Sequence, residues 1–345
     1  MKARIRERAL QLGFDVFGAA PAVPPPHGKA FVDWLRAGRH AGMAYLERRA
    51  AERLDPGRVL PGAKSVLAVG CAYGSTEAER TEAAANEGIV ARYARRLDYH
   101  KIMGKRLKEL ADFVQELGGP GCRARAYVDT GPILEREYAW LAGLGFIGKN
   151  TQLIHPRFGN WLLLGVVLTT LEIEPDRPLP NRCGSCRRCL DACPTGALRK
   201  PFELDATRCA AYWTIEARDG IPRELRGSFG NRLFGCDACL EACPWNRRSG
   251  PGALFGPETQ WSSGRLDCAE LLRLEDEAFR VRFRGTPLLR PKRRGLVRNA
   301  CVALGNVGGA SALASLEELA NSEDETLAEH ARWAAARIRD RLGAP

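Results

Sequence analysis

Residues 183–194 read CGSCRRCLDACP, and the interpretation of the whole chain starts from them. Cys183, Cys186, Cys189 and Cys193 follow the spacing C-x2-C-x2-C-x3-C-P, which is typical of ferredoxin-type iron–sulfur proteins. Three closely spaced thiolates of this kind can bind one face of a [4Fe–4S] cluster. In two-cluster ferredoxins the fourth cysteine binds the other cluster. The motif therefore predicts a second group of cysteines elsewhere in the chain.

That second group is CDACLEACP, which contains Cys236, Cys239 and Cys243, and Cys209 stands alone between the two motifs. The crossed ferredoxin pattern predicts two clusters. The first is bound by Cys183, Cys186, Cys189 and Cys243, and the second by Cys193, Cys209, Cys236 and Cys239. Zinc is the alternative ligand of paired C-x2-C motifs, but it has no use for the third cysteine or for the repeated Cys-Pro. The region is therefore predicted to transfer electrons.

The composition is that of a globular protein with two or three domains. The chain has 345 residues, which is more than one hydrophobic core usually supports. Its longest apolar run, Trp161–Leu168, is far shorter than the roughly 20 residues of a membrane-spanning helix and predicts a buried strand. No secretory signal is recognised at the N-terminus, so a cytoplasmic protein without a membrane partner is expected. Four further cysteines are expected to be core residues: Cys71, Cys122, Cys268 and Cys301.

Strands and helices alternate in the first half of the chain, which predicts an α/β domain over residues 1–175. The expected strands are residues 65–73, 123–129 and 161–173, and the expected helices are residues 99–117 and 132–143. A segment rich in proline and charge follows and marks a domain boundary. A ferredoxin-like module is therefore predicted over residues 176–248, and a helical domain over residues 249–345.

The helical domain contains a faint repeat and a concentration of positive charge. Residues 296–305 and 327–336 share a helical pattern, with residues 311–320 as an antiparallel partner between them. This spacing predicts a HEAT-like repeat, and a generic helical hairpin is the alternative. The net charge is +11, and residues 280–298 contain no acidic residue. A nucleic acid is the expected partner, and a solvated basic face is the alternative.

The chain resembles the epoxyqueuosine reductases, which are cobalamin-dependent iron–sulfur enzymes that complete queuosine in transfer RNA. The resemblance covers nearly the whole chain. Besides the cysteine motifs it is carried by LGFDVFGAA (12–20), LPGAKSVL (60–67), RYARRLDYHKIM (92–103), VDTGPILEREYA (128–139), GFIGKNTQLIHPRFGNW (145–161) and GTPLLRPKRRGLVRNACVALGN (285–306).

This resemblance implies a fold and an activity. The fold is an α/β cobalamin-binding domain with an inserted ferredoxin-like two-[4Fe–4S] module and a C-terminal α-helical HEAT-like repeat domain. The clusters would reduce cobalt to Co(I), and the cobalamin would supply the difficult chemistry. The reaction is a two-electron removal of the epoxide oxygen of epoxyqueuosine, at the wobble position of a tRNA anticodon stem-loop. A monomer is expected, with an external electron donor such as a flavodoxin or ferredoxin system.

The proton donor that the resemblance implies is Asp129 of the VDTGP motif, which is predicted to end a strand just before a helix with Pro132 in its first turn. Capping that helix is the alternative role for Asp129. A general acid must hold its proton near neutrality. Burial beside the corrin is therefore expected to raise the pKa of Asp129.

The resemblance also implies contacts to cobalamin and to tRNA. The cofactor contacts are Arg53, Tyr99, Asp129, Lys149, Asn150, Leu153, Ala211, Ala238 and Cys239. Alanine at position 211 departs from the serine expected there, and His100 is not expected to ligate cobalt. For Arg53 a surface charge is the alternative, and for Tyr99 with His100 a helix start. The tRNA contacts, which would grip phosphates while the wobble base is inserted toward cobalt, are Arg218, Arg290, Lys292, Arg293, Arg294 and Arg298.

Two other functions remain as alternatives. A reductive dehalogenase also combines cobalamin with two clusters, but it normally carries a twin-arginine export signal, and Arg48-Arg49 is internal with no apolar segment behind it. A non-catalytic electron carrier would explain the clusters. It would not explain the VDTGP and GKN segments or the basic helical region.

Overall fold

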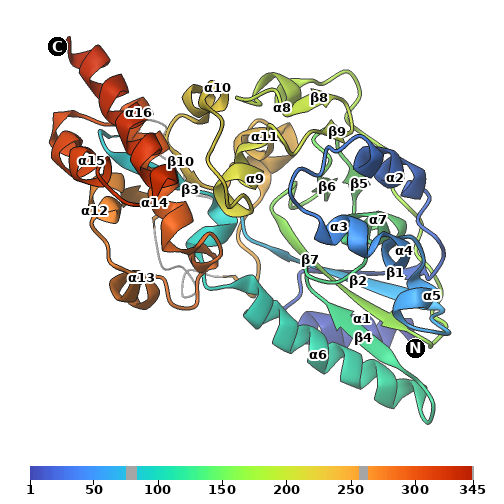
Figure 1. Ribbon diagram of the computed structural model, residues 1–345. Coiled ribbons are helices and arrows are strands. Elements are labelled where there is room, and N and C mark those ends of the chain that lie inside the picture. Colours follow the sequence, from blue (N-terminus) through green and yellow to red (C-terminus); the bar gives the residue numbers. More distant parts are fainter. Residues whose placement is uncertain (75–83, 256–262, 344–345) are drawn as a thin grey trace.

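A four-stranded sheet forms the centre of the first half of the chain (Figure 1). The computed structural model describes residues 1–74, 84–255 and 263–343, so parts of the first and third predicted domains lie outside the described residues. The strand order is β1-β2-β7-β4, and every neighbouring pair is antiparallel. The strands are β1 (Val16–Pro21), β2 (Ser65–Ala72), β7 (Leu162–Thr169) and β4 (Ala124–Tyr127). The three predicted strands are confirmed, and β1 is an addition.

Strand β1 carries a weak sequence signal because it is built largely from small residues. Its glycine, Gly18, passes so close to the end of helix α7 that a Cβ atom there would lie 2.0 Å from the carbonyl oxygen of Ala142. Only glycine permits this approach, although glycine disfavours strands. The small residues that let β1 pack in the sheet therefore have low strand propensity, which is why the sequence did not predict this strand.

Helices cover both faces of the sheet, which explains why β2 is buried along its whole length. Successive residues of a strand point to opposite faces. Leu67 packs with Met103 of helix α6 on one face, whereas Val66 packs with Tyr138 of helix α7 on the other. The helices of this part are α1 (Lys2–Gln11), α2 (Gly28–Arg36), α3 (Tyr45–Arg48), α4 (Ala50–Leu54), α5 (Pro56–Val59), α6 (Tyr99–Gly118) and α7 (Glu135–Leu141), with a 3-10 helix η1 (Arg92–Arg95).

Helix α6 begins where it was predicted, but helix α7 begins three residues later than expected. Asp98 caps α6 by accepting a hydrogen bond from the backbone N–H of His100 at 3.1 Å. Helix α7 has Leu134 as its N-cap, so Pro132 is not in its first turn and Asp129 does not cap it. The reason is a tight turn after β4, in which Asp129 adopts the left-handed conformation with φ of 59°. This turn separates Asp129 from the helix.

A second sheet joins segments from all three predicted domains. Its order is β10-β3-β11, with β3 parallel to β10 and antiparallel to β11. The strands are β3 (Glu87–Val90), β10 (Arg232–Phe234) and β11 (Arg265–Asp267). One hydrophobic core contains residues of β3 and β10 together with the C-terminal helices. The predicted domain boundaries remain predictions, and this sheet and core cross them.

Short elements surround the cysteine motifs. The hairpins are β5 (Phe146–Ile147) with β6 (Leu153–Ile154), and β8 (Leu198–Lys200) with β9 (Glu203–Leu204). The helices are α8 (Arg188–Asp191), α9 (Ala210–Ile215), α10 (Arg223–Arg226), η2 (Gly227–Phe229), α11 (Ala238–Glu241) and η3 (Pro244–Arg248). Helices α8 and α11 each follow the first cysteines of their motif and pack against each other. The two motifs thus meet in space.

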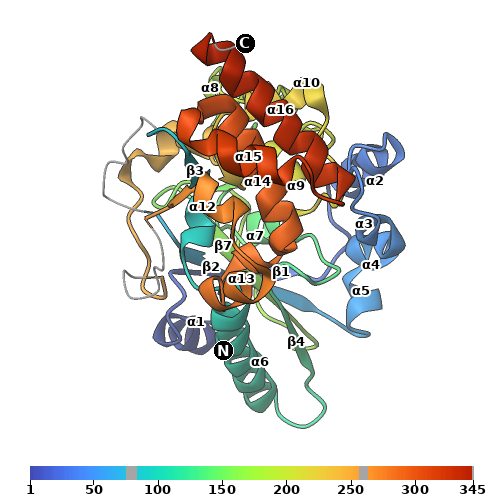
Figure 2. The ribbon, with the colours of Figure 1, turned by 60° about the vertical axis from the view of Figure 1, so that its left-hand side comes forward.

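The C-terminal region is helical, as predicted (Figure 2). Helix α16 packs along α14 and α15, which places residues 296–305 and 327–336 side by side. The assignment to HEAT repeats remains a prediction. The elements are α12 (Cys268–Leu272), α13 (Asp276–Arg282), η5 (Pro287–Leu289), α14 (Lys292–Val307), η6 (Ala310–Ala312), α15 (Leu313–Leu319) and α16 (Glu325–Leu342). Among the described residues, each helix is too short or too polar to cross a bilayer.

Candidate functional site

The structure divides the eight motif cysteines into the two groups that the crossed pattern predicts. Burial raises the pKa of the Cys243 thiol to about 11, and the nearby thiolates of Cys183, Cys189 and Cys186 act in the same direction. Cys243 therefore lies with the first three cysteines of the other motif. We call these four residues the first thiol group.

The second thiol group is assembled in the same crossed way. Burial raises the pKa of Cys239 well above its usual range, and Cys236, Cys209 and Cys193 add to this effect. Cys209 is likewise raised to about 11 by burial, with contributions from Cys236 and Cys193. Within the described residues no three His, Cys, Asp or Glu side chains meet the spacing that a single metal ion requires. Binding of a cluster would displace the thiol protons, because the thiolate is the ligand.

The remaining four cysteines lie outside the two thiol groups. Cys71, Cys268 and Cys301 are buried core residues, as expected, whereas Cys122 is half-buried.

The Lys149 ammonium donates to the carbonyl oxygens of Gly184 at 2.6 Å and Cys186 at 2.9 Å. Lys149 thus holds the loop of the first thiol group. These carbonyls use two of the three N–H donors of the ammonium, and the predicted contact of Lys149 to a corrin stays a prediction.

Asp129 lies at the centre of a polar cluster formed by segments that are distant in sequence. The Tyr99 hydroxyl donates to Asp129 Oδ2 at 2.7 Å, and His100 Nε2 lies 3.3 Å from the same oxygen. Both residues sit in the first turn of α6, where Asp98 starts the helix. Gly131 makes the turn of Asp129 possible, because a Cβ atom there would lie 2.4 Å from the ring of Tyr127. We call Asp98, Tyr99, His100, Asp129, Glu135 and Arg290 the acid cluster.

The residues around Asp129 lower its pKa, and the rise expected from burial beside a corrin stays a prediction. Burial does act to raise this pKa, but hydrogen bonds from His100 and Tyr99 and the positive charge of Arg290 lower it by more. The Asp129 side chain is 57% exposed, so solvent reaches it. In this structure Asp129 is therefore ionised at neutral pH.

The pKa of His100 is shifted in the opposite direction to that of Asp129. Burial acts to lower the pKa of His100, but hydrogen bonds to Asp129 and Asp98 raise it above its ordinary value of 6.5. Arg290 Nη2 lies 2.6 Å from His100 Nδ1, and Asp98 Oδ1 lies 2.9 Å from the same nitrogen. The Arg290 guanidinium also lies over the Tyr99 ring, 5.4 Å from its centroid. Arg290 was predicted to contact tRNA, and the structure places it in the acid cluster.

Glu135 adds a second carboxyl group to the acid cluster. Burial and the negative charge of Asp129 raise the pKa of Glu135 to about 8. Hydrogen bonds from the backbone amides of Glu135 and Asp129 lower this pKa, but by less. Its Oε1 atom is buried without a hydrogen-bond partner. Sequence reasoning missed Glu135, because an acidic residue in the first turn of a helix is common for reasons unrelated to catalysis.

Among the described residues, two buried polar atoms without hydrogen-bond partners favour a polar ligand in this region. They are Glu135 Oε1 and Thr151 Oγ1, the latter in the GKNT loop. Natural proteins rarely leave such atoms unpaired. Arg53 is 6% exposed, and its guanidinium donates to the backbone carbonyls of Tyr45 and Arg49. Burial lowers the pKa of Arg53, and the negative charge of Glu135 opposes this. The alternative of a surface charge for Arg53 is therefore wrong, and a site for a polar group is favoured.

Two of the other predicted corrin contacts lie at the second thiol group. The Asn150 side chain is 3% exposed and donates to the carbonyl oxygen of Cys239 at 3.3 Å, and Ala238 precedes Cys239 in α11. Leu153 is buried, and its contact to a corrin, like that of Ala211, stays a prediction. Tyr93 lies between the two sites. Its ring packs edge-on against that of Tyr99, with 6.0 Å between the centroids, and the backbone N–H of the neighbouring Arg92 donates at 2.6 Å to Oδ2 of Asp237, which lies between Cys236 and Cys239.

One predicted tRNA contact is wrong. Arg298 is 1% exposed, and its guanidinium donates to the carbonyl oxygens of Ala217 at 3.0 Å and Trp213 at 2.6 Å. Burial, together with the charges of Arg294 and Arg218, lowers its pKa to about 10. A phosphate cannot reach this side chain, because α14 turns it toward the cysteine region.

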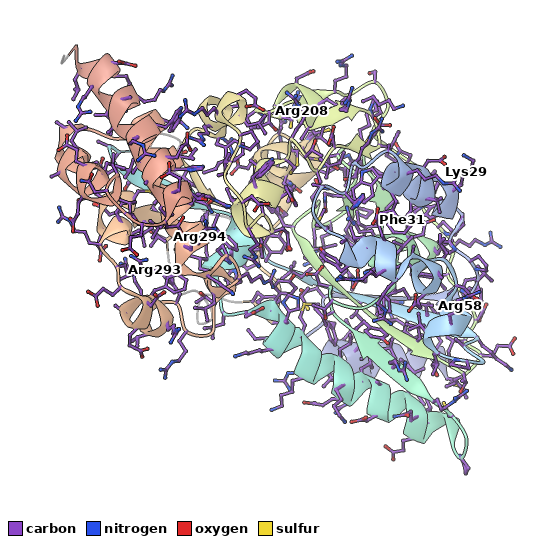
Figure 3. The ribbon with its side chains drawn as sticks, in the orientation of Figure 1. Lys29, Phe31, Arg58, Arg208, Arg293 and Arg294 are labelled. Carbon is purple, nitrogen blue, oxygen red and sulfur yellow. The ribbon has the colours of Figure 1, made fainter. Side chains whose placement is uncertain are left out.

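The other basic residues of the segment remain accessible. Arg293 and Arg294 lie close together at the beginning of α14 (Figure 3), and Lys292 beside them is exposed. Arg294 pairs with Asp324 and also donates to the carbonyl oxygen of Arg218 at 2.8 Å. Arg218 in turn donates to the carbonyl oxygen of Arg290 at 2.9 Å. This basic surface, Arg218 with Lys292 to Arg294, therefore adjoins the acid cluster.

Two family models match parts of the chain. The model described as "4Fe-4S double cluster binding domain" matches residues 182–246, which contain both thiol groups. The model described as "Epoxyqueuosine reductase QueG, DUF1730" matches residues 53–130, from the buried arginine to just past Asp129.

Whole-chain comparisons agree with these matches. The epoxyqueuosine reductase of Gloeobacter violaceus is 41% identical, over 90% of this chain and 98% of its own. A crystal structure of an epoxyqueuosine reductase with an epoxyqueuosine-modified tRNA-Tyr stem loop matches at a TM-score of 0.90 and 32% identity, over 99% of this chain and 91% of that chain. The Bacillus subtilis enzyme was solved with its aspartate-bearing catalytic loop swung out of the active site. It matches at a TM-score of 0.87 and 31% identity, over 98% of this chain and 90% of that chain.

The crossed grouping of the cysteines predicts the iron content of serine variants. Cys193→Ser and Cys236→Ser lie in different motifs but in one group, so each single variant and the double variant should keep about four of about eight irons. Cys193→Ser combined with Cys189→Ser, which lies in the same motif, should lose nearly all iron. Iron analysis and the electron paramagnetic resonance of the reduced protein measure this, with Cys122→Ser as a control that keeps all the iron. An uncrossed pattern would reverse the results of the two double variants.

Proposed function

The chain belongs to the epoxyqueuosine reductase family, and from this premise we propose that it reduces the epoxide of epoxyqueuosine in tRNA to give queuosine. The protein is thus an oxidoreductase. The reaction takes two electrons and two protons, removes the epoxide oxygen as water and leaves a carbon–carbon double bond. The observation that carries the proposal beyond family membership is the acid cluster, which the segment of Arg92 and Tyr93 joins to Asp237 of the second cysteine motif. A protein that only carried electrons would have no use for such a cluster.

The two thiol groups fit two [4Fe–4S] clusters, and the residues around Asp129 and Asn150 are proposed to bind a cobalamin. The unpaired buried atoms of Glu135 and Thr151 support this, because amide groups around a corrin ring can pair with them. When bound, cobalamin supplies the low-potential electrons for breaking the carbon–oxygen bond. Arg53, Tyr99, Asn150, Leu153, Ala238 and the backbone of Cys239 are the residues proposed to hold it.

Asp129 is the proposed proton donor, and His100 supplies its proton. Tyr99 holds the carboxylate in place through Oδ2, and His100 lies at the same oxygen. A proton that leaves His100 Nε2 for Asp129 can therefore continue to the epoxide oxygen. Entry of a ligand would remove water around Asp129, which favours the neutral carboxyl group. The aspartate-bearing catalytic loop of the Bacillus subtilis enzyme supports this role for the loop of Asp129.

Glu135 is proposed as the source of the second proton. Its pKa of about 8 keeps a large fraction of the carboxyl group protonated at neutral pH. The charge of Asp129 contributes to this pKa, so the proton on Glu135 is held more weakly once Asp129 is neutral. The two carboxyl groups therefore titrate as a coupled pair.

The basic surface is proposed to bind the anticodon stem-loop through its phosphates. Arg218, Lys292, Arg293 and Arg294 supply positive charge at the edge of the acid cluster, where a flipped-out wobble base would enter. Such contacts position the RNA and do not read its sequence. We further propose that the protein works in the cytoplasm as a monomer and receives electrons from an external donor such as a flavodoxin or ferredoxin system. The HEAT-like assignment of α14 to α16 remains part of this proposal.

Replacing Asp129 with Asn should abolish turnover and leave the rest of the site intact. Asparagine accepts the Tyr99 hydrogen bond and tolerates the left-handed backbone at this position, but it cannot donate the proton. We expect a loss of at least about a hundredfold in the single-turnover rate. Mass spectrometry of the tRNA, which loses one oxygen, measures the rate, and visible absorbance checks the clusters and the corrin. A variant with the rate of the parent protein would exclude Asp129 as the donor, and Asp112→Asn on the exposed side of α6 is the control.

The alkaline limit of the pH–rate profile should report the proton on His100. The pKa of His100 is raised and that of Asp129 is lowered, so between them the pair holds one proton, which is lost as pH rises through the pKa of His100. Asp98→Asn keeps the helix cap but should shift this limit to lower pH by about half to one unit. Arg290→Gln should shift it to higher pH, because the charge of Arg290 opposes protonation. Shifts of both variants in one direction would contradict this assignment.

Removing two cations from the basic surface should weaken tRNA binding and its salt dependence together. For Arg218→Ala with Lys292→Ala we expect about tenfold weaker binding of the stem-loop and a slope of log affinity against log salt that is smaller by about 1.5 to 2. Fluorescence anisotropy at several salt concentrations measures both quantities. Arg4→Ala with Arg6→Ala, two exposed cations of α1, should leave both unchanged. An unaltered slope in the first variant would place the RNA elsewhere.

A further inference from the structure

The two thiol groups differ in where they lie relative to the acid cluster and to solvent. The second group lies inward, since Asn150 contacts Cys239, and the segment of Arg92 and Tyr93 bonds to Asp237 and packs against Tyr99 of the acid cluster. The first group is formed by a loop whose non-cysteine residues, Gly184, Ser185, Arg187 and Arg188, are exposed. If electrons flow toward the acid cluster, they enter at the first group. This direction rests on the proposed function.

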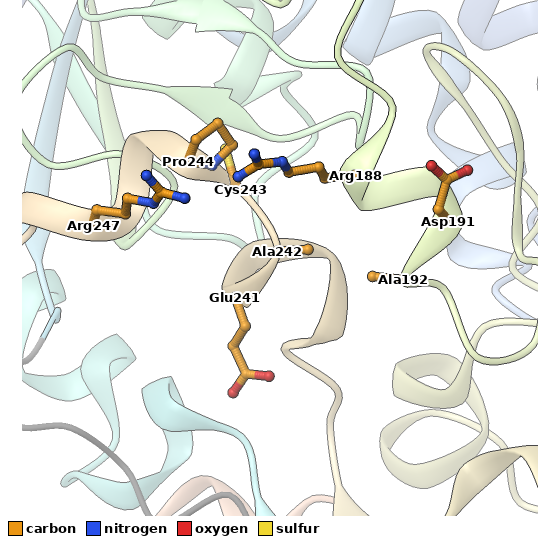
Figure 4. A pocket seen from close by; sticks show the side chains of 8 residues that line it. All are labelled: Arg188, Asp191, Ala192, Glu241, Ala242, Cys243, Pro244 and Arg247. Carbon is orange, nitrogen blue, oxygen red and sulfur yellow. The ribbon is translucent and has the colours of Figure 1, made fainter.

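A surface pocket of about 510 Å³ reaches Cys243 of the first group (Figure 4). Helices α8 and α11 form its walls, and Cys243 with Pro244 forms part of its lining. Cys243 is 8% exposed, and because it lines the pocket, the first group is approached from the surface at this residue. Electron transfer slows steeply with distance, and this pocket offers a short path.

Two arginines at this pocket lack acidic partners. Arg188 of α8 and Arg247 of η3 point toward each other across Pro244 in Figure 4. Among the described residues neither has a carboxylate within ion-pair distance, whereas Asp191 already lies 3.6 Å from Arg187. Glu241 points away from the two guanidinium groups. Arg182 and Arg187 are exposed on the same loop, so the surface beside the first group is positively charged.

We propose that this face, which we call the entry face, docks an acidic protein that carries single electrons at low potential. The entry face consists of Arg182, Arg187, Arg188 and Arg247. A cluster accepts one electron at a time, which suits a one-electron carrier. Carboxylates of that carrier would pair with Arg188 and Arg247 and bring its redox group over Cys243. Complementary charge of this kind chiefly speeds association.

The test measures reduction of the clusters in the holoenzyme by a chemically reduced, acidic flavodoxin. Stopped-flow absorbance follows the bleaching of the clusters. In the parent protein the second-order rate constant should fall as salt is added, because salt screens the attraction. In Arg188→Glu with Arg247→Glu it should be at least tenfold lower at low salt and nearly independent of salt. Reduction by dithionite, a small inorganic reductant that needs no docking, should be unchanged.

Matched variants separate this proposal from its alternatives. Arg6→Glu on α1, at the opposite end of the molecule from α8 in Figures 1 and 2, should have no effect. Where the double charge reversal disturbs cluster assembly, Arg188→Gln with Arg247→Gln should show a smaller loss in the same direction. Unchanged reduction by flavodoxin in the glutamine variant would overturn the proposal, as would a loss of stem-loop affinity without a loss of reduction, which would assign the face to RNA.

Failure of the proposed function would look different. Dithionite-reduced protein with cobalamin would then leave epoxyqueuosine unchanged in the parent and in every entry-face variant alike.

Discussion

The arrangement of the molecule depends on two buried side chains in the middle of helix α14. Arg298 and Asn299 of α14 donate hydrogen bonds to backbone carbonyls of α9, of the loop after it, and of β10. Asn299 is fully buried and bonds to Thr214 at 2.8 Å and Leu233 at 3.0 Å. Burying a guanidinium and an amide is costly unless every donor finds an acceptor. These bonds therefore hold the C-terminal helices against the segments that present Cys209 and Cys236.

This anchoring also sets the distance between the proposed RNA surface and the acid. With α14 held in place, a hydrogen-bonded path runs from Arg294 to the carbonyl of Arg218, from Arg218 to the carbonyl of Arg290, and from Arg290 to His100. A ligand that moves the basic surface would therefore also move Arg290 and change the surroundings of the proposed proton donor. The electrostatic effect of Arg290 on Asp129 gives the path a chemical consequence, since it favours the ionised acid.

Protons and electrons approach the proposed reaction site from different directions. In the proposed reaction the acid cluster would store protons, and its members come from the start of α6, from the turn before α7 and its first residue, and from the segment before α14. Electrons would come through the thiol groups, on the other side of Tyr93. Separate supply of the two is physically useful, because a reduced cluster or corrin beside a ready proton donor would be oxidised by proton reduction. The structure keeps Asp129 ionised until a ligand changes its surroundings.

Local patterns in the sequence determined the grouping of the eight cysteines, the buried strand β2 and the start of α6 at Asp98, because ligand spacing, apolar runs and helix caps act over a few residues. Asp129 was found through the family resemblance of its motif, but the turn that it forms was not. Only the tertiary structure decided that Arg298 is buried while Arg294 is exposed, that Asp129 is ionised, and that Glu135 and Arg290 join the site. These properties depend on burial and charge contributed by segments far apart in the chain, and no local pattern records them.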